Sequence, residues 1–142
     1  SEILIFLRWA ITFVRFEREM YRNPDQDLNR LWWDYVSCYQ KVTPPAGRNE
    51  PDWASKIHLA CSPAYYQNYV LGELMASQLL QFVRTSIVKS NEFAGHEATG
   101  AFLKEKIFRP GARYEWNGML RRATGEELNP KHFLDQFVTT SA

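Results

Sequence analysis

Apolar residues recur at helical spacing along this chain, and proline or glycine interrupts the pattern at its breaks. The clearest stripe has apolar side chains at positions i, i+3, i+4, i+7, i+8 and i+11, namely Leu28, Leu31, Trp32, Tyr35, Val36 and Tyr39. This spacing is typical of an amphipathic α-helix that buries one face. No segment shows the sustained alternation of a β-strand. We therefore expect an all-α protein, built as an irregular array of several helices.

The interruptions divide the chain into the expected helices. A first helix over residues 3–22 ends at Asn23-Pro24, because proline cannot continue a helix. The next begins near Asp25–Asp27, where aspartate is a good cap. Further on, Ser62-Pro63 has the pattern of a helix start, and this helix reaches about Lys89. The remaining helices are expected over 91–108, weakened by Gly95 and Gly100, over 114–124, ending at Gly125, and after Asn129-Pro130.

Composition and charge fit one folded unit. The chain has 142 residues, of which 45% are hydrophobic, and its five tryptophans, seven tyrosines and nine phenylalanines can bury a sizeable core. The formal net charge is +1, whereas nucleic-acid and membrane-surface proteins more often carry a strong excess of one sign. The apolar run Ile3–Leu7 is too short to span a bilayer. We therefore expect neither a nucleic-acid partner nor a membrane partner.

The cysteines and histidines do not form a metal motif. Cys38 and Cys61 lack metal-site spacing, and we expect two buried free thiols rather than a disulfide. None of the three histidines belongs to a His-Glu-x-x-His motif, in which two imidazoles four residues apart face a zinc ion. The segment from His96 begins like this motif but has Gly100 in the final position. We expect His96 and His132 to be surface helix residues, and no metal ligands in this chain.

Residues 56–69 place cationic and phenolic donors near an expected helix start. Tyr66 lies three residues before Tyr69 and Tyr65 lies four before it, so each pair shares a helix face. Lys56 and His58 alternate in the segment just before, where alternate side chains of an extended backbone point the same way. Such donors beside the free N–H groups of a helix start suit a carboxylate or a developing oxyanion. The alternative interpretation is that the tyrosines only pack at the core or its rim.

The order of residues in this region resembles the C-terminal part of a zinc peptidase of the angiotensin-converting-enzyme (peptidyl-dipeptidase A) family, which is related to thimet oligopeptidase and oligoendopeptidase F. The similar residues here are, in chain order, Trp32-Trp33, Tyr39-Gln40, Pro44-Pro45, Arg48, Asp52-Trp53, Lys56-Ile57-His58, Pro63, Tyr65, Tyr66, Tyr69, Phe93-Ala94-Gly95, Trp116, Thr124-Gly125 and Phe137. The match runs in order across nearly the whole chain. It implies that residues 1–142 are a single helical lobe, the C-terminal fragment of a longer, mostly helical peptidase.

The resemblance implies a role for each donor of residues 56–69. Lys56 would hold the C-terminal carboxylate of a peptide together with a tyrosine, and His58 would bind a backbone carbonyl of the substrate. Tyr69 would donate to the oxyanion of the tetrahedral intermediate. The three-residue interval between the family's two tyrosines assigns the carboxylate role to Tyr66, which we prefer, whereas counting forward from His58 assigns it to Tyr65.

The resemblance also implies what lies outside the chain. The full-length enzyme would use zinc, whose ligands are absent here, so the fragment alone should be inactive. Its partners would be a peptide substrate and the missing N-terminal part of the same protein. The animal enzymes bind an activating chloride through an arginine just before the second tyrosine, and Asn68 in that position puts chloride activation in doubt.

Two further expectations concern the isolated chain. The first helix is too apolar for a solvated surface, so we expect it to pack against the missing part and the fragment to self-associate. The alternative to a peptidase fragment is a stand-alone helical peptide-binding or interaction module without catalysis. The residues encoded before Ser1 distinguish the two, because only a peptidase would carry His-Glu-x-x-His and a following glutamate there.

Overall fold

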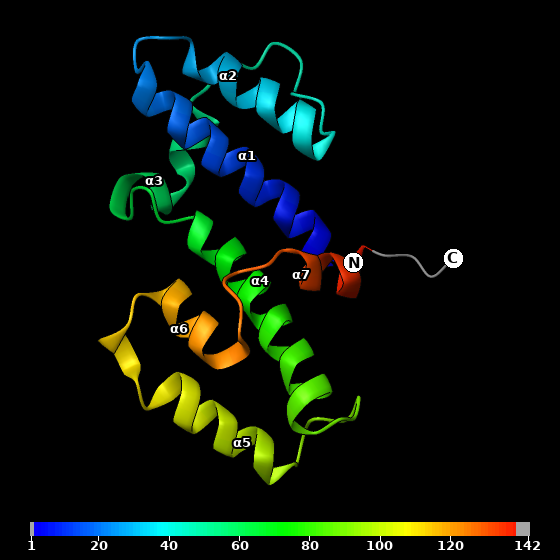
Figure 1. Ribbon diagram of the computed structural model, residues 1–142. Helices are drawn as coiled ribbons and strands as arrows, with labels where there is room; N and C mark the ends of the chain where they lie inside the picture. Colours follow the sequence, from blue (N-terminus) through cyan, green and yellow to red (C-terminus); the bar gives the residue numbers. More distant parts are fainter. Residues whose placement is uncertain (1, 139–142) are drawn as a thin grey trace. The chain divides into compact units, whose positions relative to one another are not determined.

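The computed structural model describes residues 2–138, which form seven α-helices and no β-strand (Figure 1). The α-helices are α1 (Glu2–Arg22), α2 (Leu28–Tyr35), α3 (Ile57–Cys61), α4 (Gln67–Phe82), α5 (Glu97–Leu103), α6 (Trp116–Thr124) and α7 (Lys131–Phe137). Single π-helical turns continue three of them, at Val36–Gln40, Val83–Ile87 and Lys104–Phe108, and short 3-10 turns lie at Asp52–Ser55 and Gly111–Arg113. The predicted all-α, multi-helix fold is confirmed. No helix within the described residues combines the length and the apolarity that crossing a membrane requires.

The residue contacts divide the chain into two compact units. Unit 1 is Ser1–Leu71 and unit 2 is Gly72–Ala142, and the division falls within α4. Each unit has its own group of buried side chains. That residues 1–142 act as one lobe of a longer protein stays a prediction.

Helix ends match the sequence signals where the cap chemistry is strong. α1 stops directly before Asn23-Pro24. Asp27 caps α2, since its carboxylate accepts a hydrogen bond from the backbone N–H of Arg30 at 3.0 Å. Gly125 ends α6 with a φ of 91°, a left-handed conformation that glycine adopts without a steric cost. These ends are set by contacts within a few residues, which is why the sequence predicts them.

The region before α4 differs from the prediction. Ser62 is the C-cap of α3 rather than the start of a helix, and α4 begins only at Gln67. Ala64 interrupts the backbone between them with a φ of +53°, which lies in the left-handed region that a residue with a Cβ rarely adopts. His58 consequently belongs to the short helix α3 instead of an extended segment. Tyr65 and Tyr66 precede α4, and Tyr69 lies in its first turn.

Unit 1 is held together by aromatic side chains between α1, α2 and the segment before α4. The buried residues of this cluster are Ala10, Phe13, Phe16, Trp32, Val36 and Tyr66. Phe16 meets Trp32 edge-on, with ring centroids 5.2 Å apart and planes at 83°. Burying each such side chain stabilises the fold by about 1.5–3 kcal/mol. One face of α1 therefore belongs to the core of unit 1, while Ile5 on the same helix stays 69% exposed.

In unit 2, Gln78 ties α4 to the segment between α6 and α7. Its side chain is only 1% exposed, and its Nε2 donates to the Thr124 hydroxyl at 3.1 Å and to the Glu127 carbonyl at 3.2 Å. Its Oε1 accepts from the backbone N–H of Asn129 at 2.9 Å. A buried amide costs little when it is satisfied in this way. The apolar core of this unit gathers at Val83, Phe102 and Ala123.

Two predictions about side-chain burial are wrong. Cys38 and Cys61 are free, as expected, but both are exposed, because each lies on the solvent side of its helical turn. His96 is exposed at the N-cap of α5, as predicted for a surface residue. The side chain of His132, however, is only 20% exposed, and its Nε2 lies 2.5 Å from a carboxylate oxygen of Glu126.

Candidate functional site

The structure brings together Lys56, His58, Tyr66 and Tyr69, which we name the tyrosine cluster. The Nε2 of His58 lies 3.1 Å from the hydroxyl oxygen of Tyr69. The ring of His58 is 5.0 Å from that of Tyr66 and 5.7 Å from that of Tyr69, and the two tyrosine rings are 5.2 Å apart. All four residues belong to unit 1. The sequence spacing therefore led to side chains that are neighbours in space.

Three short elements hold the cluster in place. Lys56 is the N-cap of α3 and His58 lies in the first turn of that helix. Residues 62–66 turn the chain back, and the backbone N–H of Tyr69 donates to the carbonyl of Tyr66 at 3.3 Å as α4 begins. The cluster is thus built where two helices meet through a tight turn, not along one helix face.

Tyr66 is anchored in the core of unit 1. It is 4% exposed, and its ring centroid lies 4.4 Å from that of Phe13. The indole Nε1 of Trp9 donates to its hydroxyl oxygen at 2.6 Å. The hydroxyl keeps its own proton to donate elsewhere. Trp9 has a part in the cluster that the sequence analysis missed, although its spacing of four residues from Phe13 on α1 is a signal for a shared face.

The ammonium group of Lys56 lies against aromatic faces. Its Nζ is 5.7 Å from the ring centroids of both Trp9 and Tyr66, a cation–π arrangement. Within residues 2–138, no carboxylate forms an ion pair with it. Because the aromatic faces satisfy only part of an ammonium group with three donors, Lys56 can still bind an anion.

His58 is held with one ring nitrogen covered. Its Nδ1 is buried and has no hydrogen-bond partner in the part of the chain that the structure describes. Since an unpaired buried N–H is costly, we assign the tautomer that carries its proton on Nε2. That proton points at the hydroxyl oxygen of Tyr69. The hydroxyl proton of Tyr69, a residue that is 43% exposed, is then free to be donated to a ligand.

Tyr65 lies at the edge of the cluster. It is 47% exposed, and its ring meets that of Tyr69 edge-on at 5.8 Å. It lies one residue before the buried Tyr66, so both of the tyrosines considered for the carboxylate role are next to Tyr69.

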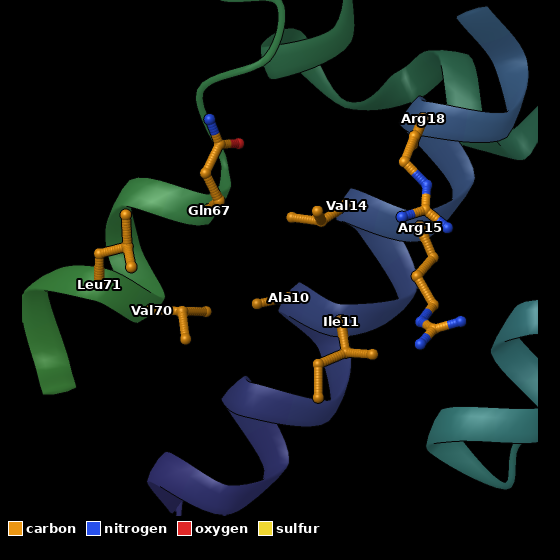
Figure 2. Close-up of a pocket in the computed structure, with 8 residues that line it drawn as sticks. All are labelled: Ala10, Ile11, Val14, Arg15, Arg18, Gln67, Val70 and Leu71. Atoms are coloured by element: carbon orange, nitrogen blue, oxygen red, sulfur yellow. The ribbon is translucent and has the colours of Figure 1, made fainter. Parts of the chain in front are cut away.

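A separate apolar pocket of about 290 Å³ lies between α1 and the first turns of α4 (Figure 2). It is lined by Ala10, Ile11, Val14, Arg15, Arg18, Gln67, Val70 and Leu71. Figure 2 shows Val70 facing Ala10 and Val14 across the space, with the guanidinium groups of the two arginines directed away from α4. The four residues of the tyrosine cluster do not line this pocket, and Tyr69 is instead open to solvent.

The described residues do not fit a zinc ion. No group of three His, Cys, Asp or Glu side chains within residues 2–138 is arranged to hold a metal. His58 is engaged with Tyr69 and His132 with Glu126. The absence of metal ligands predicted for this chain therefore stays compatible with the described geometry, and no chemistry is assigned to a metal held by these residues.

The chain matches the family model of carboxypeptidase Taq (M32) metallopeptidases over residues 5–140. It belongs to this metallopeptidase family, whose members depend on zinc. The predicted class, a zinc metallopeptidase, is thereby confirmed. The narrower resemblance to the angiotensin-converting-enzyme family stays a prediction.

Two curated relatives carry carboxypeptidase names. The chain is 27% identical over 113 residues to thermostable carboxypeptidase 1 of Pyrococcus furiosus, covering 77% of this chain and 22% of that protein. It is 28% identical over 138 residues to carboxypeptidase 1 of Bacillus subtilis, covering 92% of this chain and 26% of that protein. The chain thus spans about a quarter of the length of these relatives. No solved structure matches it.

Proposed function

We propose that this chain is the substrate-binding part of a zinc-dependent peptidase that recognises the free C-terminal end of a peptide. The observation that carries the proposal is Lys56, whose ammonium group lies beside two aromatic faces and has no carboxylate partner within residues 2–138. A carboxypeptidase and a peptidyl-dipeptidase both cleave near a free C-terminus, and both therefore need a receptor for a carboxylate. The family match and the cluster agree on this requirement.

Each member of the cluster has a role in this proposal. Lys56 binds the terminal carboxylate, and Tyr66, anchored by Trp9, donates its hydroxyl proton to the same group; Tyr65 is the alternative. The Nε2 of His58 contacts the Tyr69 hydroxyl and its Nδ1 is buried. In this proposal His58 orients Tyr69, and the binding of a substrate carbonyl that the resemblance gives it requires that contact to open. Charge-assisted hydrogen bonds of this kind are stronger than neutral ones.

Tyr69 is the proposed oxyanion donor. With the His58 proton on Nε2, the Tyr69 hydroxyl accepts from His58 across 3.1 Å and has its own proton to donate to the substrate. A neutral donor that is already oriented stabilises the negative charge that develops on the carbonyl oxygen of the scissile bond without a reorganisation cost. The described residues hold no zinc site, so the metal and its ligands are assigned to the rest of the peptidase.

The chain is proposed to be the C-terminal part of this longer peptidase. It spans about a quarter of its curated relatives, and its described residues lack a metal-ligand group. Its partners are accordingly the peptide substrate and the remaining part of the same protein. The test is the sequence encoded upstream of Ser1, where a His-Glu-x-x-His motif with a following glutamate would support this assignment. A stand-alone binding module would lack that motif.

Paired peptides test the carboxylate receptor in the full-length protein. Peptides of one sequence, with either a free C-terminal carboxylate or an amide, are cleaved by the wild type and by Lys56→Ala. We expect the KM for the free-carboxylate peptide to rise by about tenfold or more in Lys56→Ala, since a hydrogen bond to a charged group is lost. The KM for the amidated peptide should change much less.

The exposed Lys104 provides the matched control, because Lys104→Ala removes the same charge outside the cluster and should leave both KM values unchanged. Equal effects of Lys56→Ala on the two peptides would contradict the receptor. Mass spectrometry of the products counts the residues released in each step. Single amino acids identify carboxypeptidase action, and dipeptides identify peptidyl-dipeptidase action.

A further inference from the structure

Glu17 on α1 is a buried carboxylate that is bonded to the turn between α3 and α4. It is 4% exposed, and burial of a carboxylate is costly unless hydrogen bonds satisfy it. Its Oε1 accepts from the backbone N–H of Ala64 at 2.7 Å and from the hydroxyl of Tyr21 at 3.3 Å. The contact with Ala64 joins residues 47 positions apart in the sequence. The buried carboxylate of Glu17 therefore has a specific backbone partner, the N–H of Ala64.

Ala64, whose N–H makes this bond, has a strained backbone conformation in the turn before α4. Ala64 has a φ of +53°, in the left-handed region that a residue with a Cβ adopts only at an energetic cost. Strain of this kind persists where the surroundings fix the conformation. The hydrogen bond to Glu17 is such a constraint, and it is charge-assisted and short.

One face of α1 contacts the turn that precedes α4. Trp9, Phe13 and Glu17 follow each other at intervals of four residues, so they lie on the same side of the helix. Trp9 donates to the Tyr66 hydroxyl at 2.6 Å, and Phe13 lies 4.4 Å from the Tyr66 ring. Glu17 accepts from the Ala64 N–H. Three successive turns of α1 therefore fix the segment that runs from Ala64 to Tyr66.

This segment determines how His58 and Tyr69 face each other. α3, which carries His58, ends directly before the turn, and α4, which carries Tyr69, begins directly after it. The 3.1 Å contact between the two side chains spans the turn. A shift of the turn would change that separation, and a misplacement of 1 Å at a catalytic group can lower a rate by roughly a hundredfold.

We propose that Glu17 is a positioning residue for the His58–Tyr69 pair, because its carboxylate holds the left-handed turn at Ala64 and so sets where the Tyr69 hydroxyl stands. This inference rests on the role proposed for Tyr69. Glu17 itself is covered by the core and touches no substrate. Its effect reaches the site through the backbone.

Hydrogen exchange tests the structural half of the inference without any substrate. It is measured by mass spectrometry on peptides that contain residues 62–69 of the full-length protein. In Glu17→Ala we expect exchange in this segment to accelerate by about tenfold or more, since a buried hydrogen bond that restrains the turn is lost. Glu17→Gln keeps the volume and an amide acceptor, and should stay near the wild type. Glu92→Ala, at an exposed position, is the control.

Steady-state kinetics test the functional half on the same proteins. We expect kcat to fall by about tenfold to a hundredfold in Glu17→Ala, and the KM for free-carboxylate peptides to rise less, because Lys56 is untouched and Trp9 and Phe13 still hold Tyr66. Glu17→Gln should recover most of kcat. A role in folding alone would lower the amount of active enzyme without changing kcat per active site. If Glu17→Ala does not fold, Glu17→Asp replaces it, since its shorter side chain should loosen the turn and lower kcat in part.

The outcomes separate this inference from the proposed function. Faster exchange with an unchanged kcat, in an enzyme that Tyr69→Phe does impair, overturns the role of Glu17 and leaves that of Tyr69 intact. Unchanged exchange in Glu17→Ala overturns the role of Glu17 directly. If Tyr69→Phe has no effect on turnover, the proposed oxyanion donor fails, and the positioning role fails with it.

Discussion

The imidazole Nε2 of His58 lies 3.1 Å from the hydroxyl oxygen of Tyr69, while its Nδ1 is buried without a partner in residues 2–138. The two nitrogens therefore have unequal surroundings, which favours the tautomer with its proton on Nε2. This arrangement sets the direction of hydrogen-bond donation in the His58–Tyr69 pair. His58 donates to Tyr69, and Tyr69 donates outward from the protein.

Substitutions of His58 test this direction, because asparagine and glutamine place an amide nitrogen near the positions of Nδ1 and Nε2, respectively. In the full-length peptidase, we expect His58→Gln to keep a donor to Tyr69 and to retain about tenfold more turnover than His58→Asn, since one hydrogen bond separates them. His58→Ala should resemble His58→Asn. If asparagine preserves turnover as well as glutamine does, the direction assigned to the pair is wrong.

Tyr69→Phe removes the proposed oxyanion donor and keeps the ring. We expect kcat to fall by roughly 10²–10³-fold with little change in KM, since the hydroxyl acts on charge that exists only in the transition state. Tyr114→Phe, at an exposed tyrosine of unit 2, is the matched control and should leave kcat unchanged. Turnover that survives in Tyr69→Phe would rule out the assignment.

Tyr66→Phe and Tyr65→Phe distinguish the two candidates for the carboxylate tyrosine. The substitution at Tyr66 leaves the indole N–H of Trp9 without its acceptor, and we expect a loss of about 1–3 kcal/mol in the free energy of unfolding. At the exposed Tyr65 the loss should be within about 0.5 kcal/mol. Urea denaturation measures both.

Kinetics with free-carboxylate peptides then assign the role. If Tyr66 binds the carboxylate, Tyr66→Phe raises the KM for these peptides and Tyr65→Phe does not. The double variant Trp9→Phe/Tyr66→Phe removes the unpaired donor and should recover part of the stability without restoring the KM. An increase in KM for Tyr65→Phe alone would transfer the role to Tyr65.

The sequence predicted what depends on neighbouring residues and missed what depends on distant ones. The cap at Asp27 and the stop at Gly125 are local, and both were found. Ser62-Pro63 has the local pattern of a helix start, yet the chain there makes a turn whose strained Ala64 is bonded to Glu17 on α1. No local pattern contains that contact.

The tyrosine cluster was predicted from residue spacing, but the structure holds it together only partly in that way. Helical spacing suggested that Tyr66 and Tyr69 share a face, and the alternation of an expected extended segment added Lys56 and His58. The resemblance to a peptidase family then gave each residue a role. In the structure, Tyr66 lies before α4, and its position depends on Trp9 and Phe13. The neighbours were predicted correctly, whereas the contacts that hold them could be seen only after folding.

The N-cap of α6 gives a prediction for stability that does not depend on catalysis. The carboxylate of Glu115 accepts from the backbone N–H groups of Asn117 at 3.0 Å and Gly118 at 2.9 Å. These bonds lower the pKa of Glu115 below its ordinary value of 4.5. A group with a lowered pKa stabilises the fold while it is ionised, so its contribution is present above pH 4.5 and is lost as the pH falls through the folded-state pKa.

Glu115→Gln should therefore be less stable than the wild type at pH 7, and the difference should shrink as the pH falls below 4.5. Urea denaturation of both proteins across this range measures it. Glu126 and Asp52 also have lowered pKa values, through His132 and Arg48 respectively, but they contribute equally to both proteins and cancel in the difference. Glu92→Gln, at an exposed position away from any helix cap, controls for the loss of a charge. If the difference in unfolding free energy between the two proteins stays constant from pH 7 to pH 3, protonation of Glu115 has no effect on stability. The ionised cap would then not stabilise α6.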